Sequence, residues 1–216
     1  MYPNMHEATV TALEHSGCEV VAPPAQVCCG ALHAHAGDAE TARALARRNI
    51  DAFERAGVDA VIVNAAGCGA AMKEYGRLLR NDPRWGERAE AFSAKVKDAL
   101  EFVSEQDFAH DLGQVDRTVT LQDACHLAHA QGVRSAPRTI LGAIPGVDFR
   151  EMVNPDRCCG SAGLYSAVQP QMSARVLEPK MATIAATGAT TVCTSNPGCT
   201  LQIENGARRH DVDAEV

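Results

Sequence analysis

Nine cysteines are the residues best suited to chemistry in this 216-residue chain, and most of them follow a pattern. Cys28-Cys29-Gly30 recurs as Cys158-Cys159-Gly160, displaced by 130 positions, and Cys68 recurs as Cys199, displaced by 131. Where a cell keeps thiols reduced, cysteines serve more often as metal ligands or redox groups than as disulfides. The spacing predicts a duplicated unit with one cysteine site in each copy.

The second copy contains enough cysteines for a complete metal site. The four predicted ligands are Cys125, Cys158, Cys159 and Cys199, which come from three separate loops. Four thiolates are what a four-iron cluster or a tetrahedral zinc site requires. Adjacent cysteines cannot easily form a disulfide with each other, and they reach different irons of one cluster more readily than two corners of one small tetrahedron.

The first copy offers three cysteines, Cys28, Cys29 and Cys68. Subtracting the repeat offset from Cys125 places its counterpart before Met1, so we expect a truncated start or a chain cut from a longer parent. Three sulfurs leave one position to water, a histidine or another subunit. The residues alone therefore predict one metal site in the second half, an iron-sulfur cluster or a zinc ion, and a second site only if a fourth ligand is supplied.

Glycines and histidines flank these cysteines. Gly30 and Gly160 would let the backbone approach a bulky cofactor and donate N-H groups to its sulfides. His33, His35 and His126 are predicted to support the site by hydrogen bonding or proton coupling rather than by ligation. Simple turns and exposed histidines are the alternative interpretations.

The elements expected to position these residues alternate between helices and strands. Helices are predicted over residues 4–16, 39–56, 135–143 and 169–187, and strands over residues 18–23, 60–64, 118–121, 147–152 and 190–195. The charged stretch 82–114 is predicted to be a helical connector. This pattern indicates an α/β protein of two tandem, pseudo-symmetric units, each a small parallel sheet flanked by helices. The predicted domains are 1–113, which includes connector residues 82–113, and 114–216.

Charge and hydropathy exclude several classes of function. Twenty basic residues against 27 acidic ones give a net charge of −7, and no basic run offers a nucleic-acid surface. The longest apolar run, 59–68, is too short to span a bilayer, and the N-terminus lacks the features of a secretory signal. We expect a cytoplasmic chain that contacts the inner face of a membrane only through partners.

Several motifs resemble the cysteine-rich domain of heterodisulfide reductase, of lactate-utilisation proteins and, in particular, of the glycolate oxidase iron-sulfur subunit. They are Cys28 to His33 with Gly37, Asn64 to Gly69 with Lys73 to Gly76, Cys125 to Leu127, and Cys158 to Gly163 with Tyr165. The resemblance implies cluster ligation and electron transfer from a flavin-containing glycolate dehydrogenase subunit toward a membrane quinone. It implies an oxidoreductase subunit that does not oxidise substrate by itself.

The chain departs from the full family motif, which ends each copy with Cys-x-x-Cys. Ala65 and Asn196 occupy the first of those two positions, so a five-cysteine noncubane cluster is disfavoured relative to a four-cysteine [4Fe-4S] cluster. Three alternatives stay open. They are a lactate-utilisation or heterodisulfide-reductase-like subunit, a structural zinc protein that uses the second-half cysteines, and a dithiol oxidoreductase that uses one of the adjacent pairs.

Overall fold

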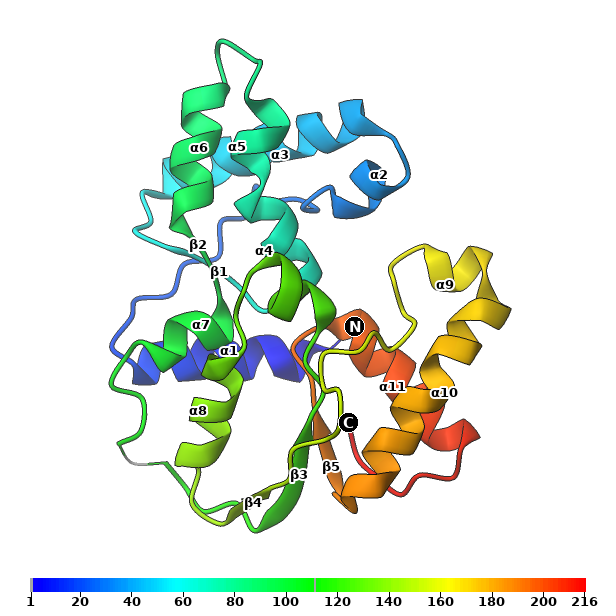
Figure 1. Cartoon of the computed structure of the whole chain (residues 1–216). Helices are drawn as coiled ribbons and strands as arrows, with labels where there is room; N and C mark the ends of the chain where they lie inside the picture. Colours follow the sequence, from blue (N-terminus) through cyan, green and yellow to red (C-terminus); the bar gives the residue numbers. More distant parts are fainter. Residues whose placement is uncertain (1, 111) are drawn as a thin grey trace. The chain divides into compact units, whose positions relative to one another are not determined.

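The computed structural model describes residues 2–110 and 112–216. These residues form two compact units: a first unit of residues 3–106, and a second unit of residues 107–216 together with Tyr2. Each unit combines helices with a small parallel sheet (Figure 1), which confirms the predicted α/β class with tandem units. The division into repeated domains 1–113 and 114–216 stays a prediction.

The first unit contains seven helices and two short strands among its described residues. Its elements are α1 (Pro3–His15), α2 (Ala31–His35), α3 (Ala39–Ala56), β1 (Val61–Val63), α4 (Ala66–Lys73), α5 (Tyr75–Leu79), α6 (Gly86–Lys95), β2 (Val96–Asp98) and α7 (Ala99–Ser104). β1 and β2 pair in parallel, with Val61 opposite Val96 and Val63 opposite Asp98.

The predicted helical connector 82–114 was wrong in one respect, because β2 divides it. Val96 is buried beside β1, and Asp98 begins α7 with a capping box: its carboxylate accepts from Leu100 N while the Glu101 carboxylate accepts from Asp98 N. The predicted strand 18–23 was also wrong, since this segment is irregular. Val21 is exposed there, and no described strand pairs with the segment to hold it in a sheet.

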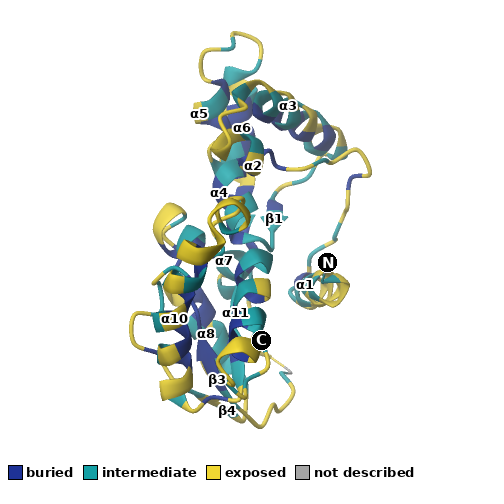
Figure 2. Cartoon of the chain, turned by 90° about the vertical axis from the view of Figure 1, so that its right-hand side faces the viewer, coloured by how far each residue is buried: buried dark blue, intermediate teal, exposed yellow. Residues whose placement is uncertain are grey.

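Helix α3 anchors the core of the first unit. Asp38 accepts a hydrogen bond from Thr41 N at its start, and Gly57 ends it in the left-handed conformation. One face of α3 is buried and the other exposed (Figure 2). Beneath it, the Tyr75 and Phe92 rings stack with centroids 5.4 Å apart. Cys29 belongs to this same apolar cluster, so the core holds one predicted ligand directly.

The second unit is built on a three-stranded parallel sheet in the order β4-β3-β5. Its elements are β3 (Arg117–Leu121), a π-helical turn η1 (His126–Ala130), α8 (Ser135–Ala143), β4 (Val147–Phe149), α9 (Tyr165–Val168), α10 (Pro170–Thr187), β5 (Thr191–Cys193) and α11 (Pro197–Arg209). Central Val119 lies opposite Phe149 on one side and Thr191 on the other. The helices and strands predicted for this half are all present; β4 and β5 are shorter than predicted and β3 is one residue longer.

The parallel strands direct the cysteine segments of the second unit toward one edge of the sheet. β3 ends at Leu121, four residues before Cys125, and β5 ends at Cys193, six residues before Cys199. The segment that follows β4 carries Cys158 and Cys159. Because the carboxyl ends of parallel strands meet at the same edge, this topology gathers the cysteines without a local Cys-x-x-Cys motif. No helix in the described ranges 2–110 and 112–216 is both long and apolar enough to cross a membrane.

Candidate metal centre

The four predicted ligands of the second unit form one continuous group of sulfur atoms. Side-chain hydrogen bonds connect Cys125 with Cys158, Cys158 with Cys159, and Cys159 with Cys199. All four are free thiols; Cys159 and Cys199 are buried, and Cys125 and Cys158 are half-buried. The fold therefore brings together side chains that are up to 74 positions apart in the sequence.

Within this group the sulfurs divide into proton donors and proton acceptors. The pKa of Cys158 is lowered by the hydrogen bond from Cys125, then by that from Cys159 and by Gly160 N, which lies 3.3 Å from its sulfur. The pKa of Cys199 is lowered by the hydrogen bond from Cys159, against the effect of burial. The pKa values of Cys125 and Cys159 are raised because each acts as a donor to these sulfurs; the single S–H proton of Cys159 serves either Cys158 or Cys199 at any one time. Two of the four sulfurs thus favour the thiolate, the form that binds metal.

Gly160 is required at its position by two features of the backbone. Its φ is +88°, and a Cβ there would lie 2.5 Å from the carbonyl oxygen of Ser173 in α10. Ser173 Oγ donates to Gly160 O over 2.8 Å, and Gln202 Nε2 of α11 donates to Ser173 Oγ over 3.0 Å. The Cys158-Cys159 loop is therefore held against two helices.

His126 and Asn196 also lie beside the cysteine sulfurs. The Nδ1 atom of His126 is 3.6 Å from Cys125 Sγ, and Asn196 Nδ2 donates to Cys199 Sγ over 3.5 Å. His126 thus lies where the sequence placed it, next to a predicted ligand. Asn196, which occupies the position of a missing motif cysteine, instead supplies a hydrogen bond to the cysteine that remains.

The three cysteines of the first unit also come together. Cys29 donates a hydrogen bond to Cys68, which raises the pKa of Cys29 and lowers that of Cys68, and Cys28 hydrogen bonds with Cys29. Within the described part of this unit, Cys18 makes no hydrogen bond to these three. The structure therefore brings three cysteine sulfurs together in the first unit, and their role as metal ligands stays a prediction.

Asn49 and Tyr75 hold the backbone of the first cysteine pair. Asn49 Nδ2 donates to Cys28 O over 3.2 Å, and its Oδ1 accepts from Val27 N over 2.8 Å. The Tyr75 hydroxyl donates to Cys29 O over 2.7 Å and accepts from Asn49 Nδ2 over 3.1 Å. We did not expect this pair from the sequence. The available signal was a polar residue on the otherwise apolar buried face of α3.

The predicted supporting residues of the first site lie in different surroundings. Gly30 has φ +82°, and a Cβ there would come within 3.2 Å of the Ala42 backbone. His33 Nδ1 lies 3.4 Å from the carboxylate of Asp38, and both side chains are partly exposed. His35 lines a cavity of about 800 Å³ together with Cys29 and Gly30. His33 thus interacts with the Asp38 carboxylate, whereas His35 lies at the cavity beside Cys29.

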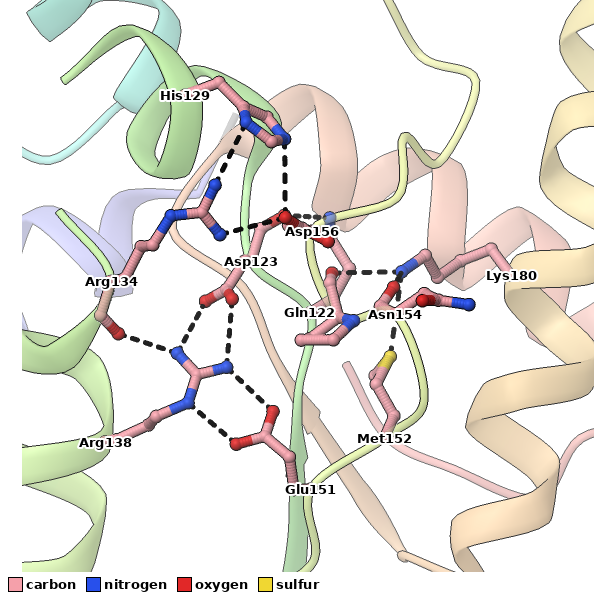
Figure 3. Close-up of polar contacts among 11 residues, drawn as sticks. Gln122, Asp123, His129, Arg134, Arg138, Glu151, Met152, Asn154, Asp156 and Lys180 are labelled. Carbon is pink, nitrogen blue, oxygen red and sulfur yellow. Dashed lines mark hydrogen bonds and ion pairs between the residues drawn. The ribbon is translucent and has the colours of Figure 1, made fainter. Parts of the chain in front are cut away.

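A network of polar and charged residues lies on the segments that lead to the second-unit cysteines (Figure 3), and the sequence motifs did not reveal it. The Asp123 carboxylate, 3% exposed, accepts two hydrogen bonds from Arg138 at 3.1 and 2.9 Å, and Arg138 also pairs with Glu151. Gln122 joins the two strand ends: its Nε2 donates to Asp123 O, and its Oε1 accepts from Thr194 Oγ1 over 2.6 Å. These contacts fix the segment between β3 and Cys125.

The donor chemistry of the second site fits a metal cluster bound by cysteine. It provides four sulfurs in one hydrogen-bonded group, two of them with lowered pKa, and a backbone N-H directed at one sulfur. Among the residues that the structure describes, no three His, Cys, Asp or Glu side chains are arranged to hold a single metal ion. The four sulfur atoms contact one another in pairs. Their fit to a metal cluster therefore rests on the chemistry of these donor atoms.

Comparisons with known proteins agree with the geometry. The model of the CCG cysteine-rich domain family matches residues 1–73 and 119–204. A probable glycolate oxidase iron-sulfur subunit of Bacillus subtilis is 46% identical over the whole chain, which spans 49% of that protein's length. Lactate utilization protein A of an Exiguobacterium species is 31% identical over 97% of the chain and 85% of its own length. The lactate utilization protein A of Bacillus subtilis is 29% identical over 99% of the chain and 89% of its own length.

Proposed function

Because the chain belongs to the CCG cysteine-rich domain family, we propose that it binds an iron-sulfur cluster and transfers electrons as a subunit of an oxidoreductase. The observation that carries this proposal is the continuous hydrogen-bonded group of Cys125, Cys158, Cys159 and Cys199. Relatives whose names contain "iron-sulfur subunit" and "lactate utilization" support it.

These four cysteines would hold a [4Fe-4S] cluster, which when bound supplies one-electron redox chemistry. Gly160 N-H and the Asn196 amide donate hydrogen bonds to two of the sulfurs and so stabilise their negative charge. The buried Cys159 and Cys199 keep water from one side of the site. In the first unit, Cys28, Cys29 and Cys68 would need one further ligand to hold a second cluster.

We propose glycolate or a related 2-hydroxy acid as the substrate of the complex. A flavin-containing partner would oxidise it, and this chain would relay the electrons toward a quinone-type acceptor at the inner membrane face. The name of the relative that is 46% identical supports glycolate. The second candidate is a lactate-utilisation complex, which is favoured because the chain covers 85% of one lactate utilization protein A.

Metal analysis tests the cluster directly. The full chain is purified without oxygen, and iron, acid-labile sulfide and zinc are measured per chain. The proposal predicts about four irons and a matching amount of sulfide for one [4Fe-4S] cluster. Zinc without sulfide would contradict it and leave a structural metal protein.

Substrate-driven reduction separates the two candidate complexes. The cluster-loaded chain is mixed without oxygen with its copurifying flavoprotein and either glycolate or lactate, and reduction is followed by electron paramagnetic resonance (EPR). Faster reduction by glycolate supports a glycolate dehydrogenase. Faster reduction by lactate supports the alternative, and failure of both substrates would contradict the proposed place of the chain in such a complex.

A further inference from the structure

Lys180 carries a buried amino group whose hydrogen-bond partners are all uncharged. Its side chain is 0% exposed in the middle of α10. Nζ donates to Asn154 O and Pro155 O, both at 3.0 Å, and lies 3.7 Å from Met152 Sδ (Figure 3). Within the described ranges, no carboxylate forms an ion pair with it. A buried ammonium group without a counter-charge is costly, so the site must supply one.

The nearby carboxylates already have cationic partners. Asp123 accepts two hydrogen bonds from Arg138, and Asp156 lies 2.9 Å from Arg134 and 3.6 Å from His129. Arg138 is shared with Glu151, so these partners balance the carboxylates only in part. The other source of negative charge near Lys180 is the cysteine group itself, whose sulfurs are thiolates whenever they bind metal.

Hydrogen bonds connect Lys180 to two of the cysteine segments. Asn154 and Pro155 belong to the loop that leads to Cys158 and Cys159. Pro155 O also accepts from Asp123 N over 3.1 Å, on the segment that leads to Cys125. One carbonyl oxygen thus joins α10 to both segments.

The electrostatics agree with this placement. Burial lowers the pKa of Lys180, and the thiolate form of Cys159, which metal binding requires, opposes this effect most strongly, ahead of Asp156 and Asp123. In turn, the positive charge of Lys180 contributes to lowering the pKa of Cys199. The ammonium group and the cysteine site therefore stabilise each other's charged forms.

We propose that Lys180 is the buried counter-charge of the second cysteine site, and that its positive charge raises the reduction potential of the cluster held there. The inference rests on the proposed function, because it requires a bound cluster. Reduction adds one negative charge to the site, and a fixed cation in a low-dielectric interior stabilises that added charge. Lys180 is not a ligand. It positions the loop that contains Asn154 and Pro155, and its ammonium charge raises the reduction potential of the cluster.

A purely structural role is the competing explanation, since Lys180 also holds two loop carbonyls in place. Three substitutions separate the roles. Lys180→Gln keeps a neutral donor, Lys180→Met keeps the chain length without a donor or charge, and Lys180→Arg keeps the charge. Arg175→Gln is the matched control, because Arg175 is an exposed cation on the same helix.

The test is a redox titration of the cluster-loaded full chain, followed by EPR. At the wild-type midpoint potential, Lys180→Gln and Lys180→Met are expected to show about a tenfold lower ratio of reduced to oxidised cluster, which corresponds to about 59 mV for one electron. Lys180→Arg and Arg175→Gln should stay near the wild-type ratio. Cluster-loaded Lys180→Gln and Lys180→Met with wild-type ratios would overturn the inference and leave the proposed function intact. A wild-type chain that binds zinc and no cluster would overturn the function itself.

If the neutral variants bind no cluster, urea unfolding of the cluster-free chain distinguishes the counter-charge role from a purely structural one. Without thiolates bound to metal, a charged Lys180 lacks its main counter-charge, so Lys180→Gln, which keeps a neutral donor for the loop carbonyls, should unfold at the same urea concentration as wild type or a higher one. A clearly lower unfolding midpoint would indicate that Lys180 is only a structural support and would overturn the inference.

Discussion

The hydroxyl of Tyr75 donates a 2.7 Å hydrogen bond to the carbonyl oxygen of Cys29, and both residues are buried. The same hydroxyl accepts from Asn49, whose amide also contacts Cys28 O. One aromatic side chain in the core thus sets the backbone position of the first cysteine pair. Burial raises the pKa of Tyr75, so the hydroxyl stays protonated and remains a donor at neutral pH.

Replacing Tyr75 by Phe is expected to lower the free energy of unfolding by about 1 to 2 kcal/mol. The substitution leaves the buried Cys29 carbonyl without its donor and removes one of the two acceptors of the Asn49 amide, which keeps Cys28 O. Urea unfolding measures the change, with Tyr165→Phe as control because Tyr165 is exposed. Equal stabilities of the two variants would show that the hydrogen bond contributes nothing.

Gly160→Ala is expected to damage the second site more than an ordinary glycine substitution. The new Cβ would meet Ser173 O at 2.5 Å, whereas Gly132 also has positive φ but no atom within 4 Å of the place that a Cβ would take. Gly132→Ala should cost about 1 kcal/mol from backbone strain alone. Gly160→Ala should cost more and lose iron, as measured by urea unfolding and metal analysis. Similar losses in both variants would contradict a tight fit at Gly160.

The buried carboxylate of Asp123 is expected to depend on Arg138. Arg138→Met removes its two-point partner and should cost about 3 kcal/mol, because a buried charge is left uncompensated. Arg150→Met breaks an exposed pair with Asp148 and should cost less than about 1 kcal/mol. Thermal and urea unfolding of both variants provide the comparison. An equally small loss of unfolding free energy in both variants would mean that water stabilises the charge of Asp123 when Arg138 is absent.

The first unit should lose stability as the pH rises through about 6, because burial raises the pKa of Asp98 to about 6 from an ordinary 3.8. The folded chain binds this proton more tightly than the unfolded chain does. The contribution is therefore fully present below about pH 4 and is lost above pH 6, on the order of 2 kcal/mol. Asp98 Oδ2 is buried without a hydrogen-bond partner, which agrees with this cost of ionisation.

Asp98→Asn should remove most of this pH dependence, because the amide does not ionise and its oxygen can still accept from Leu100 N. The unfolding free energy is measured from pH 4 to 8, with exposed Asp59→Asn as control. A pH profile of Asp98→Asn that matches wild type would assign the dependence to another group.

The α/β class could be predicted because strand-helix alternation and the repeat at an offset of 130 residues are both visible in the sequence itself. Sequence reasoning missed β2 because Val96 also fits the helical spacing of its neighbours, and only pairing with β1 makes it a strand. It predicted a strand at 18–23 because Val20 and Val21 favour strands, although no described strand pairs with them. Tertiary pairing decided both cases.

The cysteine groups could be predicted from repeated motifs, but the residues around them could not. Lys180 lies on the buried face of α10 between Leu177 and Ile184, where helical spacing calls for an apolar residue. A charge at that position usually extends to solvent. Here the loop carbonyls of Asn154 and Pro155 accept from it, and these contacts depend on the folded arrangement of distant segments. The role of Asn49 was hidden for the same reason.

The most direct test of cluster binding by the second unit is EPR of dithionite-reduced protein in the variants Cys199→Ser and Cys193→Ser. Cys199 belongs to the hydrogen-bonded cysteine group, whereas Cys193 on β5 is a half-buried thiol whose pKa is raised by desolvation alone. We predict that Cys199→Ser loses or alters the iron-sulfur signal and that Cys193→Ser keeps the wild-type spectrum and iron content. An unchanged spectrum in Cys199→Ser, or no iron-sulfur signal in the wild-type chain, would contradict cluster binding at this site.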